Sequence, residues 1–266
     1  FLMARLYPAL AGTEQWFYMV SLTGMATLLV GAYVAMFKHD LKGLLAHSTV
    51  SQLGLITLLF GMGTELAAVA AVFHVINHAT FKASLFMAAG IIDHETGTRD
   101  MRRINGLWRY MPHTATLAMV AASSMAGVPL LNGFLSKEMF FAESLQLNLP
   151  GIWAWIPPIV ATLAGIFAVA YSARFVHDVF FNGKPVNLPI YPPHEPPRYM
   201  KIPVEILVFA CVMVGVFPAY SVGPLLYSAS AATLGGEVPD YRLAVMHGFN
   251  LPLMMSFAAF ICGRIM

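Results

Sequence analysis

The sequence AAVFHVINHATFKASLFMAAG, residues 70–90, decides the fold class of this chain. A helix that crosses a membrane needs about 20 mostly apolar residues, and this stretch supplies them. Within it His74, His78 and Lys82 stand four residues apart, so a helix places them on nearly one face. Ionisable groups at this depth are costly unless they face protein or water. We therefore interpret the three residues as a row that handles protons.

Two other readings of this row stay open. In one, the histidines only hydrogen-bond neighbouring helices and Lys82 extends to the membrane surface. Lys82 lies well inside the stretch, which weakens that reading. In the other, His74 and His78 bind zinc, because an HxxxH spacing places two imidazoles on one face. No glutamate follows His74 directly and no third ligand stands out, so we expect no metal.

Composition places the row in a membrane protein. Hydrophobic residues make up 58% of the chain and charged residues 11%, whereas a soluble domain carries roughly 25% charged residues. The net charge of +2 is too small to indicate a nucleic-acid partner. Cys211 and Cys262 both lie in apolar stretches and are expected to be buried thiols. We therefore expect an all-α polytopic membrane protein.

Seven apolar stretches approach the length of a membrane span: 16–37, 43–62, 66–92, 113–149, 152–181, 202–226 and 243–266. With seven spans, alternate loops share a side, and one side collects nine basic residues: Lys38, Lys42, Arg99, Arg102, Arg103, Arg109, Lys184, Arg198 and Lys201. The positive-inside rule makes this side cytoplasmic. The arrangement requires that stretch 113–149 crosses only once, as two half-helices.

The interruption in that fourth stretch reads GVPLLNG, residues 127–133. Pro129 removes an amide donor, and Gly127 and Gly133 weaken a helix. Broken helices at membrane depth often lie near an ion site, and Lys137 and Glu138 follow within two turns. A short surface turn, with Lys137 at the membrane interface, explains the pattern equally well. Spacing alone leaves both alternatives open.

The second helix begins with a polar face. Asp40 is expected to cap its first turn. Lys42 and Ser51 belong to a polar set that continues into the membrane: Lys42, His47, Ser48, Thr49, Ser51 and Gln52. Such a face fits either a hydrated path or hydrogen bonding between helices.

Three of these stretches together resemble a known family. They are DLKGLLAHSTVSQLGLI (40–56), FHVINHATFKASLFMAAGII (73–92) and MAGVPLLNGFLSKEMFF (125–141). They resemble the antiporter-like membrane subunits, which include the large proton-pumping subunits of respiratory complex I and the A-type subunit of Mrp-type Na+/H+ antiporters. Two further stretches, YPPHEPPRYMKIPVEIL (191–207) and HGFNLPLMMS (247–256), are similar to the Mrp branch.

The resemblance implies a fold of two inverted five-helix repeats, each with a broken helix and a central lysine. Residues 1–181 would form the second repeat, 182–201 a proline-rich cytoplasmic loop, and 202–266 additional transmembrane helices. The fold would thus have about seven transmembrane helices, one of them discontinuous.

The same resemblance gives the site residues their roles. Lys82 matches the lysine that connects the family's hydrophilic axis, and His74 and His78 match the histidines that precede it. Lys137 matches the lysine of the broken helix, where the second half-channel ends. Four residues would support the path or form its mouth: Asp40, Lys42, Ser51 and Glu138.

The implied function is proton translocation within a multisubunit Na+/H+ antiporter in a bacterial inner membrane. The partners would be other membrane subunits, and the chain would belong to a transporter without a cofactor rather than to an enzyme. The alternative is a proton-pumping subunit of complex I or of a membrane-bound hydrogenase. The family's first repeat is not found and the chain starts at Phe1 without Met. We therefore expect a fragment that does not transport alone.

Overall fold

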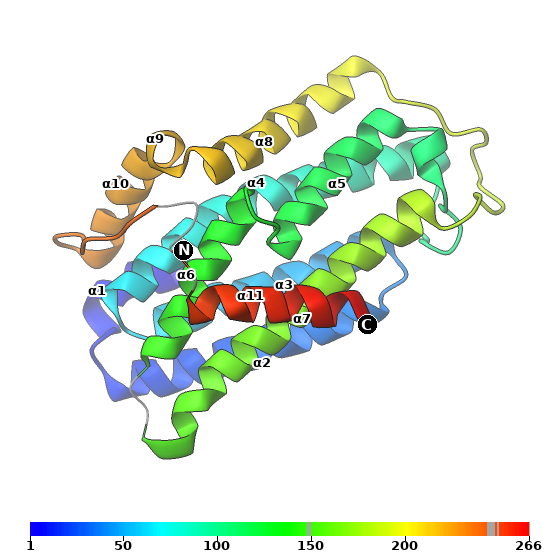
Figure 1. The fold of residues 1–266 in the computed structure, drawn as a ribbon. Coiled ribbons are helices and arrows are strands. Elements are labelled where there is room, and N and C mark those ends of the chain that lie inside the picture. The colour runs from blue at the N-terminus through cyan, green and yellow to red at the C-terminus, as the bar shows by residue number, and fades with distance from the viewer. Residues whose placement is uncertain (148–149, 244–247, 249, 266) are drawn as a thin grey trace.

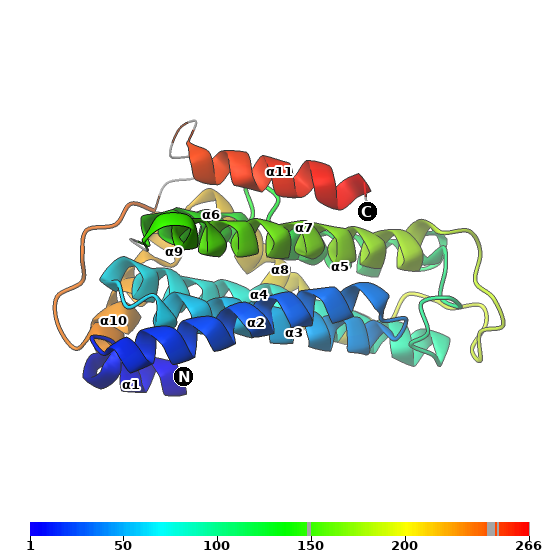
Figure 2. The same ribbon diagram turned by 90° about the horizontal axis from the view of Figure 1, so that it is seen from below.

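The computed structural model describes residues 1–147, 150–243, 248 and 250–265, and that part of the chain is helical without β-strands. Its α-helices are α1 (Leu2–Leu10), α2 (Glu14–Phe37), α3 (Leu41–Gly61), α4 (Glu65–Thr96), α5 (Pro112–Ala126), α6 (Asn132–Gln146), α7 (Ile156–Val176), α8 (Arg198–Val216), α9 (Pro218–Ser221), α10 (Gly223–Leu234) and α11 (Leu251–Ile265). Figures 1 and 2 show an elongated bundle in which the long helices run side by side.

Five of the described helical segments are long and apolar enough to cross a membrane: Glu14–Phe37, Leu41–Gly61, Glu65–Thr96, Gly151–Phe181 and Arg198–Val216. Helices α2, α3 and α4 begin where side-chain oxygens accept from the first-turn amides. Thr13 accepts from the Trp16 amide at 3.2 Å, and Thr64 accepts from Ala67 at 3.2 Å. The predicted cap of α3 is confirmed, because Asp40 Oδ1 accepts from the Gly43 amide at 2.6 Å.

Helix α4 is the centre of the bundle. It contacts α3, α5, α6, α8 and α10 and is buried along most of its length. Gly97, in the left-handed conformation at φ 71°, ends the helix. A helix surrounded by protein on several sides can carry polar side chains that lipid would not tolerate. The residues of α4 that face its neighbours therefore include His74, Asn77 and Lys82.

The basic loops meet at one end of the bundle. The amide of Leu41 donates to Arg99 O, the amide of Val186 to Arg103 O, and the amide of Ile190 to Thr96 O. These bonds join loops 38–40, 97–111 and 182–197, which lie together at the right of Figure 1. We call this end of the bundle the basic end. The hydrogen bonds confirm the prediction that these three loops lie on one side.

The interruption in stretch 113–149 separates two helices of 15 residues each, α5 and α6. Each is about 22 Å long, shorter than the roughly 30 Å core of a bilayer. Gly127 ends α5 at φ 93°, and its amide donates to the Ser123 and Ser124 carbonyls. Leu130 also takes a positive φ, 70°, before α6 begins at Asn132.

One expectation about the helices was wrong. Stretch 202–226 is not one helix, because α8 ends at Val216 and Pro218 begins the separate short α9. Proline lacks an amide donor and restricts the residue before it, which forces the chain out of the helix at Phe217. The short helix α1 was not expected from the sequence. Of stretch 243–266, residues 244–247, 249 and 266 lie outside the described residues.

Glycines allow α2 and α3 to approach closely. A Cβ added to Gly24 would lie 2.5 Å from the Leu58 amide nitrogen, and one added to Gly31 would lie 2.5 Å from that of Ser51. From α3, a Cβ on Gly61 would lie 2.6 Å from the Ser21 amide nitrogen. Contacts this short require the backbones to separate, so these glycines set the spacing of the helix pair.

We expect Gly24→Ala to destabilise the protein by about 1–3 kcal/mol, because the added methyl group overpacks this contact. Gly90→Ala on α4 is the control, since a Cβ there has no atom within 4 Å. It should be neutral or stabilising by up to about 1 kcal/mol. Melting temperatures of the purified full-length protein in its complex measure both. Equal melting temperatures for the two variants would contradict the close-packing argument.

Candidate functional site

The row predicted on α4 lies inside the protein. His74 is fully buried, Lys82 is 4% exposed, and His78 between them is partly buried. The rings of His74 and His78 are stacked, with centroids 6.2 Å apart and planes at 23°. The spacing of four residues has therefore produced a continuous polar stripe on the central helix.

His74 uses both ring nitrogens to join two other helices to α4. Its Nδ1 lies 2.9 Å from Ser136 Oγ on α6, and its Nε2 lies 2.8 Å from Gln52 Oε1 on α3. Gln52 Nε2 in turn donates to the Tyr171 hydroxyl on α7 at 3.2 Å. One imidazole thus lies at the centre of a hydrogen-bonded network that connects four helices.

Lys82 stays within the bundle and does not extend to the surface. Its Nζ donates to Ser48 Oγ and, at 3.3 Å, to Leu45 O, both on α3. Among the described residues, no ion pair joins this ammonium to a carboxylate. Neutral oxygens alone therefore hold the charge.

Lys137 is bound to the end of the preceding half-helix. It is 6% exposed, and its Nζ donates to Met125 O at 2.7 Å and to Ala126 O at 2.9 Å. The last carbonyls of a helix lack intrahelical partners and carry partial negative charge. The ammonium on α6 therefore neutralises the C-terminus of α5. Lys137 therefore lies inside the helix bundle, which favours a broken helix over a lysine that extends to the membrane interface.

Asn132 fixes the geometry of the break. Its Nδ2 donates to Thr80 Oγ1 on α4 at 2.7 Å, and its Oδ1 accepts from Ser124 Oγ on α5. Gly133 follows, and an added Cβ there would meet the Ser124 carbonyl carbon at 2.8 Å. Gly127 is thus required by its positive φ, and Gly133 by the close approach of the Ser124 backbone. Pro129 lies in the segment between the two half-helices.

The other predicted residues lie apart from this centre or support it. Lys42 Nζ lies 2.8 Å from Asp93 Oδ2 at the basic end. Ser51 Oγ donates to Leu28 O on α2 at 2.9 Å, so it serves the contact between α2 and α3. Glu138 is buried on α6. Hydrogen bonding between helices thus accounts for Ser51, whereas Gln52 on the same helix joins the row.

Sequence reasoning missed several residues of the site. Ser136, Tyr171, Asn132 and Thr80 were not assigned a role, although all but Tyr171 lie in stretches that carry the resemblance. Polar residues in apolar stretches were the available signal. Their partners depend on how α4, α6 and α7 pack together, which spacing along one helix does not give.

The first 163 residues match the family model described as "NADH:quinone oxidoreductase/Mrp antiporter, TM". The chain belongs to this family. It is 61% identical over 263 residues to a probable K+/H+ antiporter subunit of type A/B from Rhizobium meliloti, covering 99% of the chain and 26% of the relative. It is 40% identical to the A-type subunit of the Na+/H+ antiporter of Alkalihalophilus pseudofirmus, covering 100% of the chain and 36% of the relative.

Two solved structures share the fold. A chain of the Mrp complex of Dietzia sp. DQ12-45-1b has 36% identity and a TM-score of 0.88. The match covers 99% of this chain and 28% of the Dietzia chain. A chain of respiratory complex I of Thermus thermophilus has 25% identity and a TM-score of 0.69. The match covers 84% of this chain and 46% of the Thermus chain. The chain therefore spans about a quarter to a half of the chains it resembles. Its family and its apolar helices make it a multi-pass membrane protein.

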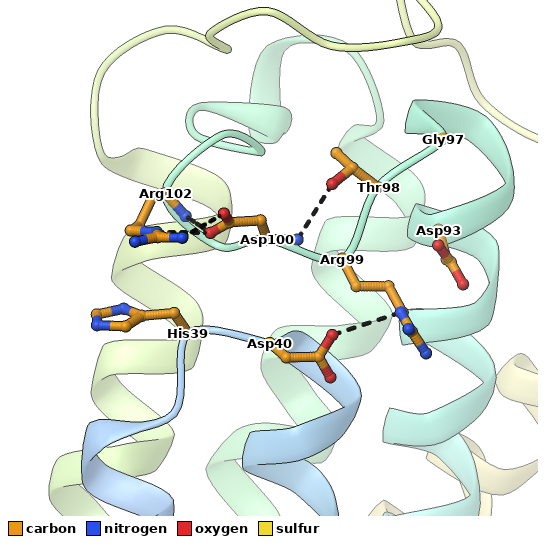
Figure 3. Close-up of a pocket in the computed structure, with 8 residues that line it drawn as sticks. All are labelled: His39, Asp40, Asp93, Gly97, Thr98, Arg99, Asp100 and Arg102. Atoms are coloured by element: carbon orange, nitrogen blue, oxygen red, sulfur yellow. Dashed lines mark hydrogen bonds and ion pairs between the residues drawn. The ribbon is translucent and has the colours of Figure 1, made fainter.

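A pocket of about 570 Å³ lies at the basic end of this family member, where α3 begins and α4 ends. Figure 3 shows Arg99 extending toward Asp40, whose Oδ2 lies 3.4 Å from Arg99 Nε, with Asp93 beside them. Arg102 Nε and Nη2 donate to the two oxygens of Asp100 at 2.9 and 2.8 Å. These bonds lower the pKa of Asp100 to about 2. The predicted mouth residue Asp40 thus lies in a charged pocket, separate from the buried row.

We expect Gln52→Leu to lower the melting temperature of the assembled protein more than Tyr171→Phe. The leucine leaves both the His74 imidazole and the Tyr171 hydroxyl without this partner, and each buried orphan costs about 1–3 kcal/mol. Thermal unfolding of the complex measures the difference. Gln15→Leu on the exposed start of α2 is the matched control and should have little effect. An unchanged melting temperature in Gln52→Leu would contradict the network.

We expect the Asp100–Arg102 contact to persist across the physiological pH range. A depressed pKa means that the contact contributes fully above the ordinary value of 3.8 and is lost as the pH falls through about 2. Infrared titration of carboxyl groups in wild type and Asp100→Asn should therefore differ only at the acid limit. A carboxyl signal that titrates between about pH 4 and 6 and disappears in Asp100→Asn would refute the assignment.

Proposed function

We propose that this chain is the proton-translocating part of the A-type subunit of a multisubunit monovalent cation/proton antiporter. The observation that carries the proposal is the buried Lys137 ammonium on the carbonyls of a broken helix. The adjacent residue, Ser136, hydrogen-bonds His74 of the row. Lys82, His78 and His74 thus follow one face of α4, and His74 contacts the residue next to Lys137 on α6.

The proton path in this proposal connects Lys82, His78, His74 and Lys137. The stacked imidazoles bring the row from Lys82 to His74, and Ser136 joins it to the lysine of the broken helix. His78 Nε2 and the Asn77 amide atoms are buried without a hydrogen-bond partner in the described protein. Internal water commonly satisfies such atoms, so water can complete the steps that side chains do not bridge.

Charge coupling drives the transfer. Lys82 and Lys137 form no ion pair with a carboxylate among the described residues. Because the protein interior screens charges weakly, a nearby charge alters the proton affinity of each lysine. Loss of a proton from Lys137 removes a positive charge from the C-terminus of α5 and leaves its carbonyls with unbalanced dipoles. Uptake of a proton through His74 restores the balance.

In the proposed organisation, α2 to α7 form the second five-helix antiporter-like repeat within residues 1–181. Helices α5 and α6 make its one discontinuous span. Residues 182–201 form the cytoplasmic loop, and 202–266 add further transmembrane helices, which gives about seven spans in total. In this organisation Asp40 and Lys42 form the mouth at the basic end, Glu138 lies next to Lys137 on α6, and Ser51 holds α2 against α3.

The Mrp-type assignment is favoured over complex I because the solved Mrp chain has both the higher identity, 36% against 25%, and the higher TM-score, 0.88 against 0.69. The named relatives exchange protons for Na+ or K+, which indicates a monovalent cation. The proposed partners are the other membrane subunits of the antiporter in a bacterial inner membrane. The chain would act in transport, within that complex, and not as an enzyme.

Lys137→Ala should reduce cation-driven proton movement by about tenfold or more, because a relay group on the path is lost. The full-length protein with all its subunits is returned to cells lacking their own Na+/H+ antiporters. The pH change that Na+ or K+ causes is then measured in inverted vesicles. Lys82→Ala should have a similar effect. Lys184→Ala, in the exposed loop after α7, is the control and should transport normally.

Transport at the wild-type rate in assembled Lys137→Ala complexes would reject this role. If the cations have no effect and NADH instead drives proton movement, the chain belongs to a complex I-type enzyme.

A further inference from the structure

The half-helix α5 is held to the rest of the protein by polar contacts at its two ends. At the C-terminal end, the Met125 and Ala126 carbonyls accept from Lys137 Nζ. Between the ends, the described residues 115–122 form no side-chain hydrogen bond to another helix, since Thr116 bonds only within α5. The contacts at the N-terminal end therefore decide how the other half of this helix is fixed.

The N-terminal end of α5 lacks a cap of its own. Met111 precedes the helix and has no oxygen in its side chain to accept from the first-turn amides. Glu195, in the loop between α7 and α8, supplies the acceptors instead. Its Oε1 accepts from the His113 and Thr114 amides at 2.7 and 3.0 Å, and its Oε2 accepts from the Thr114 hydroxyl at 3.0 Å. One carboxylate thus caps a helix more than 80 residues away in the sequence.

The loop that carries Glu195 is itself attached to two other helices at the basic end (Figure 1). His194 Nδ1 contacts Oε2 of Glu95, a buried carboxylate at the end of α4. Lys201 Nζ, near the start of α8, lies 3.5 Å from Glu195 Oε2. These contacts keep the Glu195 carboxylate in place, so the start of α5 cannot move relative to α4 and α8 without breaking them.

We propose that Glu195 is a positioning residue for Lys137, because it fixes the half-helix whose carbonyls bind that lysine. The inference rests on the proposed function, in which Lys137 relays protons. A helix carries partial positive charge at its N-terminus and partial negative charge at its C-terminus. The Glu195 carboxylate and the Lys137 ammonium therefore complement opposite ends of α5, which is about 22 Å long.

The body of α5 allows a change at one end to reach the other. Its buried face consists largely of small side chains: Ala115, Ala118, Ala121 and Ala122. Such a face makes few contacts that would stop the helix from shifting along its axis. Without Glu195 the helix shifts or its first turn frays, and the Met125 and Ala126 carbonyls move relative to Lys137. Hydrogen bonds weaken steeply as their geometry departs from the ideal, so a small shift disturbs the lysine.

Transport by the complete complex, with the full-length chain, tests the role of Glu195. Glu195→Ala removes the three bonds and the charge, and should slow cation-driven proton movement about threefold to tenfold per assembled complex. Glu195→Gln keeps one oxygen that can accept from the amides but loses the charge, so its rate should lie between those of Glu195→Ala and wild type. Glu14→Ala is the matched control, because Glu14 is an exposed carboxylate in the first turn of α2. It should transport normally.

Hydrogen–deuterium exchange of the same purified complexes separates positioning from a purely local cap. In Glu195→Ala, exchange should become at least about threefold faster at residues 113–116, because the first-turn amides lose their acceptor. It should also become faster at residues 125–131, at the other end of α5, where the helix meets Lys137. Both segments should exchange as in wild type in the Glu14→Ala control.

Faster exchange confined to residues 113–116 would show that Glu195 only caps the helix, and would overturn the proposal whatever the transport rate. Transport at the wild-type rate in Glu195→Ala would overturn it as well. If Glu195→Ala does not assemble, Glu195→Gln carries the test through the same two measurements. Wild-type transport and wild-type exchange at residues 125–131 in that variant would then reject the role of Glu195.

The two proposals fail separately. If Lys137→Ala abolishes transport while Glu195→Ala changes neither transport nor exchange at residues 125–131, the positioning role is wrong and the proposed function stands. If Glu195→Ala speeds exchange at both ends of α5 but Lys137→Ala transports normally, Glu195 does hold the half-helix. The proposed function is then wrong, because Lys137 does not lie on the proton path.

Discussion

The contact on which the site depends is the bond between the Lys137 ammonium and the last carbonyls of α5. A membrane interior offers no water to unpaired backbone groups, so a helix that ends at depth needs a partner for its free carbonyls. Lys137 Nζ supplies two bonds, to Met125 O and Ala126 O. The same contact provides the Lys137 ammonium with carbonyl oxygens as acceptors, which lipid chains lack. The broken helix and the buried lysine therefore require each other.

The rest of the bundle positions this contact. Asn132 begins α6 and ties it to Thr80 on α4 and to Ser124 on α5, which holds the two half-helices in register. His74, six residues before Thr80, then lies within hydrogen-bonding distance of Ser136. Glycines in α2 and α3 let that helix pair pack tightly. Gln52 and Tyr171 complete the attachment of α4 to its neighbours.

Much of the arrangement could be predicted from local patterns. The spacing of His74, His78 and Lys82 predicted a single face, and GVPLLNG predicted an interruption, because both follow from the geometry of one helix. Whether that interruption was buried could not be derived from spacing, since it depends on which helices surround α6. The same limit hid Tyr171, whose partner Gln52 is more than a hundred residues away. The end of α8 at Val216 could have been predicted from the sequence, because Pro218 is a local signal that ends a helix.

Three lysines of the bundle differ in the groups that hold their side chains. Lys42 lies at the basic end, partly exposed, and pairs with the Asp93 carboxylate at 2.8 Å. This ion pair joins α3 to α4. Lys82 and Lys137 are buried on hydroxyl and carbonyl oxygens, which are neutral. Dipoles hold an ammonium without a compensating charge, and the proposed charge coupling depends on this difference from Lys42. The proposed relay needs groups that can change charge, and Lys82 and Lys137 are buried lysines without an ionic partner in the described bundle.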